Sequence, residues 1–402
     1  MEGSCGGSRR HFLKTAAASG AALTAGDSLL AAQAKSPMPL VTLGKTGQKV
    51  TRLGMGTSWD VAESFVQRAI ASGVRYIDTS EAYERGNAEK TLGTVLERTG
   101  MRKQVYLVTK NNSFSKIKGS AKAKSFVTHL EASLERLKTD YVDCYYMHGV
   151  EGADIPIFRD EEVIKAFEQL KKSGKIKFAG FSCHDRMLPE IVEAGAAAGW
   201  LDQIMIQYNF RTMDGDALRR AVDKASKANL GIVAMKTQGG AKEFQEGEKD
   251  PRMNALIDKG FKVHQAAIKA VFNDERIHAV VSEMTNFDQL RENMGGATNP
   301  LGPKDARLLE EHRVLTAGLY CHGCGHLCET AAKGVPVDTV LRYYRYYEAY
   351  GKREEARALY QALPPQSRMV ADLDLADLDA ACPHGLPVAD LLRTADRKLG
   401  QA

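Results

Sequence analysis

The feature that most constrains the fold is a regular alternation of short apolar runs and amphipathic segments between residues 51 and 283. Eight runs have the length and composition of buried strands: 51–56, 75–79, 105–110, 143–148, 178–183, 203–209, 231–237 and 277–283. The segments between them carry apolar residues three and four positions apart, which predicts helices, as at 62–72, 122–137, 161–173 and 216–229. Eight such units in about 260 residues favour an α/β fold of the (β/α)₈ barrel type over an open doubly wound sheet.

Two further observations refine this prediction. No Gly-x-Gly-x-x-Gly motif follows the first apolar run, which disfavours a Rossmann-type nucleotide site. Residues 40–47 precede the first run and are typical of a hairpin that closes the lower end of a barrel.

The chain of 402 residues is longer than one barrel requires. We therefore predict a signal peptide over residues 1–34, the barrel over 35–310, and a small, mainly helical C-terminal domain over 311–402. Within that last domain, 337–350 and 353–362 have helical periodicity, and their tyrosines are interpreted as packing residues.

Composition excludes some classes of partner. Hydrophobic residues make up 44% and charged residues 26% of the chain, as in an ordinary globular protein. The net charge of +5 is small, and no basic run is interleaved with aromatic residues, so a nucleic-acid partner is disfavoured. No apolar stretch is long enough to predict a membrane span.

The N-terminal segment resembles an address signal. Residues 8–14 read Ser-Arg-Arg-His-Phe-Leu-Lys, an Ala-rich stretch follows, and Ala-Gln-Ala at 32–34 is a small-x-small cleavage pattern. This order indicates export by the twin-arginine machinery and a periplasmic or other extracytoplasmic location. The rival interpretation is a tail in which two arginines are adjacent by chance. Because this route moves folded proteins, often loaded with a cofactor, it also favours a bound cofactor.

Four titratable side chains are expected to meet at one end of the barrel. Asp78, Lys110 and His148 end three consecutive strands, and Tyr83 lies five residues after Asp78. Reactive groups of such barrels lie at the C-terminal ends of the strands.

Together these four groups suit carbonyl reduction. Tyr83 would donate the proton, and the ammonium of Lys110 is expected to lower its pKa. Asp78 would hold Lys110, and His148 would orient the substrate oxygen. Each residue taken alone has a structural explanation, such as a helix cap or core packing, so their joint placement carries the prediction.

Three segments carry a resemblance to the aldo-keto reductase family: 76–83 (Tyr-Ile-Asp-Thr-Ser-Glu-Ala-Tyr), 140–148 and 174–182. The similarity extends over roughly residues 39–300, with the motifs in family order. It implies a small-molecule carbonyl substrate and NADP or NAD as cofactor. By that resemblance the cofactor-binding residues are Ser182, Gln207, Thr285, Gln289, Glu292 and Asn293.

Two departures from the family pattern concern the nucleotide. Cys183 and His184 follow Ser182, where the family often has asparagine. Glu283 replaces a common glycine, and its negative charge would repel the 2′-phosphate of NADP.

The tail carries a cluster of candidate metal ligands: Cys321, Cys324, Cys328 and Cys382, the last followed by Pro383. Cys-Pro closes the cysteine runs of bacterial ferredoxins. The tail resembles the ferredoxin-like domain of one aldo-keto reductase branch, which implies one [4Fe–4S] cluster because four cysteines suffice for only one. Zinc with His322 or His326, disulfides, and an empty vestigial site are the alternatives.

The sequence therefore favours an NAD(P)-dependent aldehyde or ketone reductase, or the reverse alcohol dehydrogenase. Two other functions stay open: an iron–sulfur electron-transfer protein with a redox partner, and an exported nucleotide-binding redox sensor with little turnover.

Overall fold

The computed structural model of the chain describes residues 38–114, 117, 121–239, 251–324, 327–370, 373 and 376–401. The predicted signal peptide, residues 1–34, lies outside the described residues, so its role stays a prediction. Among the helices that are described, none has the length and apolar character needed to cross a membrane.

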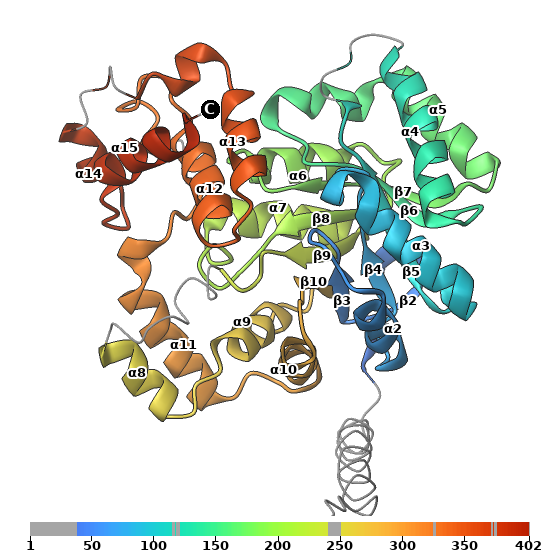
Figure 1. Cartoon of the computed structure of the whole chain (residues 1–402), viewed down its shortest axis with the longest axis horizontal. Coiled ribbons are helices and arrows are strands. Elements are labelled where there is room, and N and C mark those ends of the chain that lie inside the picture. The colour runs from blue at the N-terminus through green and yellow to red at the C-terminus, as the bar shows by residue number, and fades with distance from the viewer. Residues whose placement is uncertain are drawn as a thin grey trace, which may run out of the picture. The chain divides into compact units, whose positions relative to one another are not determined.

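Eight parallel strands close into a barrel, with the neighbour order β10-β3-β4-β5-β6-β7-β8-β9 (Figure 1). Their bounds are β3 Leu53–Gly56, β4 Tyr76–Asp78, β5 Tyr106–Asn111, β6 Val142–Met147, β7 Ile176–Cys183, β8 Gln203–Gln207, β9 Gly231–Met235 and β10 Ala279–Glu283. The predicted (β/α)₈ barrel is confirmed. Strand ends differ from the predicted ones by no more than two residues, because buried parallel strands have near-continuous apolar sequences.

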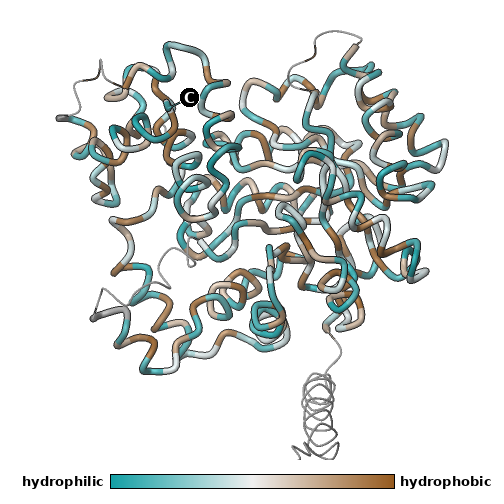
Figure 2. Tube along the Cα trace, in the orientation of Figure 1, coloured by the Kyte–Doolittle hydropathy of each residue, from teal (hydrophilic) through white to brown (hydrophobic). Residues whose placement is uncertain are grey.

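Helices follow the strands and cover the barrel with their apolar stripes. They are α2 Glu63–Ala71, α3 Asn87–Thr99, α4 Ala121–Leu137, α5 Glu161–Lys172, α6 Leu188–Ala197, α7 Asp216–Lys227, α8 Pro251–Asp258, α9 Val263–Phe272, α10 Phe287–Thr298 and α11 Pro303–Leu315. In α7, Leu218 and Val222 are buried while the intervening charged residues are exposed. Hydrophobic and hydrophilic residues alternate along the helices around the barrel, as the brown and teal stretches of the tube show in Figure 2. Asp160 caps α5 by accepting hydrogen bonds from two backbone amides.

The predicted hairpin is also observed, as β1 (Leu40–Thr42) paired antiparallel with β2 (Lys49–Thr51). Its connecting turn lies against the start of β9, where the Lys45 amide donates to the Asn229 carbonyl at 2.6 Å. Gly44 has a φ of +48°, and a Cβ there would lie 2.5 Å from the Gly231 nitrogen. Glycine is therefore required for Leu43 to enter the barrel core from its lower end.

The tail folds around a core of its own, built by α12 (Val337–Glu348), α13 (Arg353–Gln361), α14 (Ala376–Ala381) and α15 (Val388–Leu399). The two helices predicted from periodicity correspond to α12 and α13. The proposed domain boundary at residue 310 lies within α11, and the division into domains stays a prediction.

Candidate active site

Three consecutive strands and one loop bring the four predicted catalytic side chains together. Lys110, near the end of β5, donates from Nζ to Asp78 Oδ2 at 2.6 Å and to the hydroxyl of Tyr83 at 3.1 Å. The Thr79 carbonyl accepts a third hydrogen bond from the same ammonium at 2.7 Å. Lys110 and Asp78 are almost fully buried, so their ion pair is shielded from water.

His148 follows β6 and completes the group. Its ring meets the Tyr83 ring edge-on, with 5.5 Å between centroids. Its Nδ1 lies 3.0 Å from the hydroxyl oxygen of Ser80. That oxygen also accepts a hydrogen bond from the Ala82 amide, and its proton can go to Nδ1 at 3.0 Å or to the Lys110 carbonyl at 3.5 Å. When Ser80 donates to Nδ1, the shorter of these two contacts, the ring proton of neutral His148 is on Nε2.

Burial dominates the electrostatics of the site. Burial raises the pKa of Tyr83 well above its ordinary value, and the nearby charges of Asp78 and Glu283 add to the rise. The expectation that Lys110 would lower the pKa of Tyr83 is therefore wrong in its net direction, because desolvation of the phenolate is the largest influence and the two carboxylates act in the same direction. Burial also lowers the pKa of His148, with Lys110 and Lys236 adding to it, so the imidazole is neutral at neutral pH.

The predicted carboxamide-binding residues lie on the two strands beyond His148. Ser182 is buried in β7, where its hydroxyl oxygen accepts a hydrogen bond from the Gly149 amide at 3.0 Å. Gln207 ends β8 and is partly exposed. Both side chains therefore lie at the same rim as the catalytic group.

The remaining predicted nucleotide residues lie around the start of α10. Gln289 accepts hydrogen bonds from the amide and hydroxyl of Thr285, at 2.6 and 3.1 Å. Asn293 is buried and donates to the Ser282 hydroxyl, so it supports the end of β10. Glu292 is partly buried, and burial raises its pKa. Glu283 is exposed and accepts a hydrogen bond from Ser58 at 2.5 Å.

The structure adds side chains that the sequence did not single out. Lys236 directly follows β9 and donates to the hydroxyl of Tyr346, on α12, at 2.9 Å. Arg342, one turn earlier on α12, donates to Nδ1 and to the carbonyl of His184 at 3.1 and 3.2 Å. The position of Lys236 at the end of a strand could have marked it in the sequence as a candidate site residue. The tail partners had no such signal, because they are separated from the barrel residues by more than a hundred positions.

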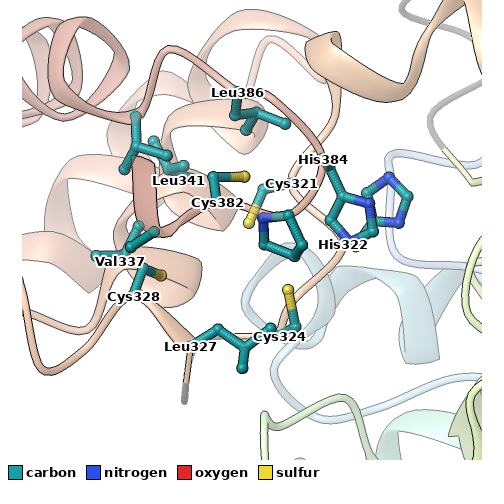
Figure 3. A pocket seen from close by; sticks show the side chains of 13 residues that line it. Cys321, His322, Cys324, Leu327, Cys328, Val337, Leu341, Cys382, His384 and Leu386 are labelled. Carbon is teal, nitrogen blue, oxygen red and sulfur yellow. The ribbon is translucent and has the colours of Figure 1, made fainter. Parts of the chain in front are cut away.

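The four tail cysteines line one pocket (Figure 3). The other residues that line the pocket are mostly apolar, and the sulfur atoms of the four cysteines face the same space. All four are free thiols, so the disulfide alternative is not realised among them. Within the described part of the chain, however, no three or more His, Cys, Asp or Glu side chains are arranged to hold a metal ion. His326, the alternative zinc ligand, lies outside the described residues.

His322 also lines this pocket. Its ring stacks on that of His384, with 3.6 Å between centroids. Burial and the neighbouring His384 and Arg211 lower the pKa of His322 to about 3. A neutral imidazole is the form that binds metals, so His322 has the right protonation state for the zinc alternative.

Comparisons with known proteins agree with the fold. Residues 51–314 match the Aldo/keto reductase family. The L-galactose dehydrogenase of Arabidopsis thaliana is 25% identical over 301 residues, which cover 69% of this chain and 94% of the relative. The "Uncharacterized oxidoreductase YqkF" of Bacillus subtilis (strain 168) is 31% identical over 164 residues, 39% of this chain and half the length of the relative.

Solved structures give the same result. The crystal structure of an aldo-keto reductase from Klebsiella pneumoniae in complex with NADPH aligns with a TM-score of 0.54 at 23% identity. The alignment covers 69% of this chain and 95% of that chain. At this level of identity the likeness shows the fold alone.

Proposed function

The chain belongs to the aldo/keto reductase family, and we propose that it reduces the carbonyl group of a small molecule with hydride from a nicotinamide nucleotide. The observation that carries this proposal is the hydrogen bond from Lys110 to Tyr83 at 3.1 Å. Because the phenol oxygen accepts that bond, its own proton is free to be donated to a substrate oxygen.

Each member of the group has a part in this reaction. Tyr83 donates the proton as hydride reaches the carbonyl carbon, and Lys110 stabilises the phenolate that forms. Asp78 keeps Lys110 in place. His148 donates from Nε2 to the carbonyl oxygen, because Ser80 occupies Nδ1. The reverse direction, oxidation of the alcohol, uses the same groups with the proton returning to Tyr83.

We propose NADP or NAD as the cofactor, with the carboxamide at Ser182 and Gln207. The Klebsiella pneumoniae protein of the same fold is described as an NADPH complex. Glu283, however, presents a carboxylate close to Thr285, where it would oppose a 2′-phosphate.

The direct test is turnover by the purified full-length chain. Reduced nucleotide is followed by its absorbance while aldehydes and ketones of different size and charge are added, with NADPH and NADH compared in parallel. Oxidation of the nucleotide that depends on the carbonyl compound, with alcohol as product, is expected. Tight nucleotide binding without turnover of any carbonyl compound would instead favour the redox sensor.

A second proposal concerns the tail pocket. Four free thiols with apolar walls are the number and kind of donors that one [4Fe–4S] cluster takes, and Cys321, Cys324, Cys328 and Cys382 would hold it after drawing closer together than they are in the described structure. Such a cluster would carry single electrons. The cysteine loop also lies against the barrel, since a Cβ on Gly323 would be 4.0 Å from Gln207 Nε2. This proximity favours a redox role, with an external redox partner, over a purely structural one.

Anaerobic purification tests the cluster. About four iron atoms per chain and broad visible absorbance are expected, and Cys382→Ser should lose most of the iron. Cys183→Ser is the matched control, because that buried thiol lies in β7 and should leave the iron content unchanged. One zinc per chain without visible colour would replace the cluster by a structural metal. Absence of both metals after reconstitution would make the site vestigial.

We also propose export by the twin-arginine machinery. Replacing Arg9 and Arg10 by lysine should leave the precursor in the cytoplasm, because the receptor recognises the arginine pair. Normal export of that variant would contradict the proposed location.

A further inference from the structure

Two cations at the rim of the barrel, Lys236 and Arg342, have no role in the chemistry derived so far. Lys236 follows β9, and Arg342 comes from α12 of the tail. Among the described residues their hydrogen-bond partners are uncharged: the hydroxyl of Tyr346 for Lys236, and His184, Thr339 and Tyr343 for Arg342. Arg342 Nε is buried without any partner.

The carboxylates that the structure describes do not pair directly with these cations. Within the part of the chain that the structure describes, neither side chain has a carboxylate within ion-pair distance. Asp338, on the same helix, attracts Arg342 electrostatically but forms no salt bridge with it. A partly buried cation normally has an anionic partner, because desolvation is costly when the charge is uncompensated.

Neighbouring groups respond to the resulting positive field. Burial raises the pKa of Tyr346, yet Lys236 and Arg342 outweigh it, and the net shift is downward. Burial lowers the pKa of His184 well below its ordinary value, and Lys236 and Arg342 lower it further. The positive potential is therefore concentrated where the tail meets the barrel rim.

Lys236 and its partner Tyr346 act electrostatically on the reacting groups. The charge of Lys236 contributes to the lowered pKa of His148, and Tyr346 contributes to the raised pKa of Tyr83. Lys236 also has a φ of +55°, a conformation that is costly for a residue with a side chain and that is found preferentially at functional sites. An anion held here would be part of the molecule whose carbonyl reaches Tyr83.

We propose that Lys236 and Arg342 form an anion-binding subsite for the carboxylate of the substrate. The substrate class is then a carbonyl compound that carries a carboxylate, and the tail contributes to specificity as well as to folding. Arg342 is suited to this role because its guanidinium can bind a carboxylate through two parallel hydrogen bonds. This inference rests on the proposed carbonyl reduction, but its test does not require turnover.

The test is calorimetric titration of the full-length protein, loaded with NADP⁺, with benzoate and with benzamide. The two probes have nearly the same shape and differ in charge. Benzoate is expected to bind about tenfold more tightly than benzamide. Arg342→Met and Lys236→Met should each remove most of that difference and leave benzamide binding unchanged.

Two further variants separate charge from folding. Arg342→Lys keeps the charge and should retain more benzoate affinity than Arg342→Met. Arg393→Met removes an exposed cation of the tail, on α15, and should leave benzoate binding unchanged. Circular dichroism of each variant checks that the tail is folded.

Equal binding of benzoate and benzamide by the wild-type protein would overturn the subsite. Variants that weaken NADP⁺ binding rather than benzoate binding would also overturn it, because the cations would then serve the nucleotide phosphates. Benzoate binding together with no reduction of any aldehyde would instead refute the proposed function and leave the subsite intact. The two hypotheses therefore fail in distinguishable ways.

Discussion

Replacing Tyr83 by phenylalanine tests the proposed acid with little disturbance of the fold. The substitution removes the hydroxyl and keeps the ring that packs edge-on against His148. Lys110 retains two of its three acceptors, the Asp78 carboxylate and the Thr79 carbonyl. The stability cost should therefore be that of one hydrogen bond, about 1 kcal/mol.

The expected loss of activity is much larger. Removing a general acid costs a factor of roughly 10²–10⁴ in rate, or about 3–5 kcal/mol of transition-state stabilisation. The assay compares kcat for an aldehyde and the dissociation constant of NADPH in the wild-type and variant proteins, with the nucleotide affinity expected to be unchanged. Tyr145→Phe is the matched control, because that buried hydroxyl bonds the Phe126 carbonyl and lies outside the group. Retention of more than about a tenth of the activity by the Tyr83 variant would remove Tyr83 from the acid role.

The pH dependence gives an independent check on the same residue. Burial raises the folded-state pKa of Tyr83, so the phenol stays protonated through neutral pH. It loses its proton only as the pH rises through that raised value. Reduction should therefore hold its rate up to the ordinary tyrosine pKa of about 10, as far as the fold persists. A decline that begins well below that pH, in protein that is still folded, would contradict Tyr83 as the donor.

Three further substitutions probe the surroundings. Lys110→Met should abolish most activity and move any remaining basic limb of the pH–rate profile to higher pH. It should also destabilise the protein by about 3–5 kcal/mol, because Asp78 is left buried without its cation. An unchanged pH–rate profile would make Lys110 only a structural partner. Ser80→Ala should lower kcat with little change in KM, because Nδ1 of His148 loses the partner that fixes its tautomer. Ser80→Thr keeps a hydroxyl and should restore kcat. A change confined to KM would refute this positioning role. Glu283→Gln should raise the affinity for NADPH relative to NADH, measured by fluorescence titration, and equal effects on both nucleotides would show that the carboxylate does not face the 2′-phosphate.

The barrel could be predicted from the sequence because its signal is local. Each strand is a short apolar run and each helix has its own periodicity, so no long-range information was required. The rule that reactive groups follow strand ends then brought Asp78, Lys110 and His148 to one rim, where the structure places them. The first arm and turn of the hairpin were readable at residues 40–47, whereas its second strand, Lys49–Thr51, lies outside the predicted range.

Two properties of the site could not be predicted in this way. The direction of the Tyr83 pKa depends on how completely surrounding atoms exclude water, and sequence spacing does not report burial. The contacts of Lys236 with Tyr346 and of His184 with Arg342 join residues far apart in the chain. No local pattern distinguishes Tyr346 from the packing tyrosines beside it, so its place at the barrel rim is known only from the structure.

The position of α12 leads to one last prediction, which connects the cysteine pocket with the barrel. Val337 and Leu341 of this helix line the pocket, whereas Arg342 and Tyr346 reach His184 and Lys236.

A helix is stiff along its axis, so a change in the packing of Leu341 should displace Arg342, its neighbour in the chain. Leu341→Ala is expected to lower benzoate affinity several-fold while the affinity for NADP⁺ stays constant, because none of the proposed nucleotide-binding residues has a described hydrogen bond to α12. Leu392→Ala is the matched control, since that leucine is buried in the same tail core but lies on α15.

Both substitutions should cost about 2–5 kcal/mol of stability through the cavity they create. If both weakened benzoate binding equally, general loosening of the tail would explain the effect. If neither did, Arg342 would hold its position independently of the pocket, and the cysteines and the barrel rim would be two separate sites on one chain.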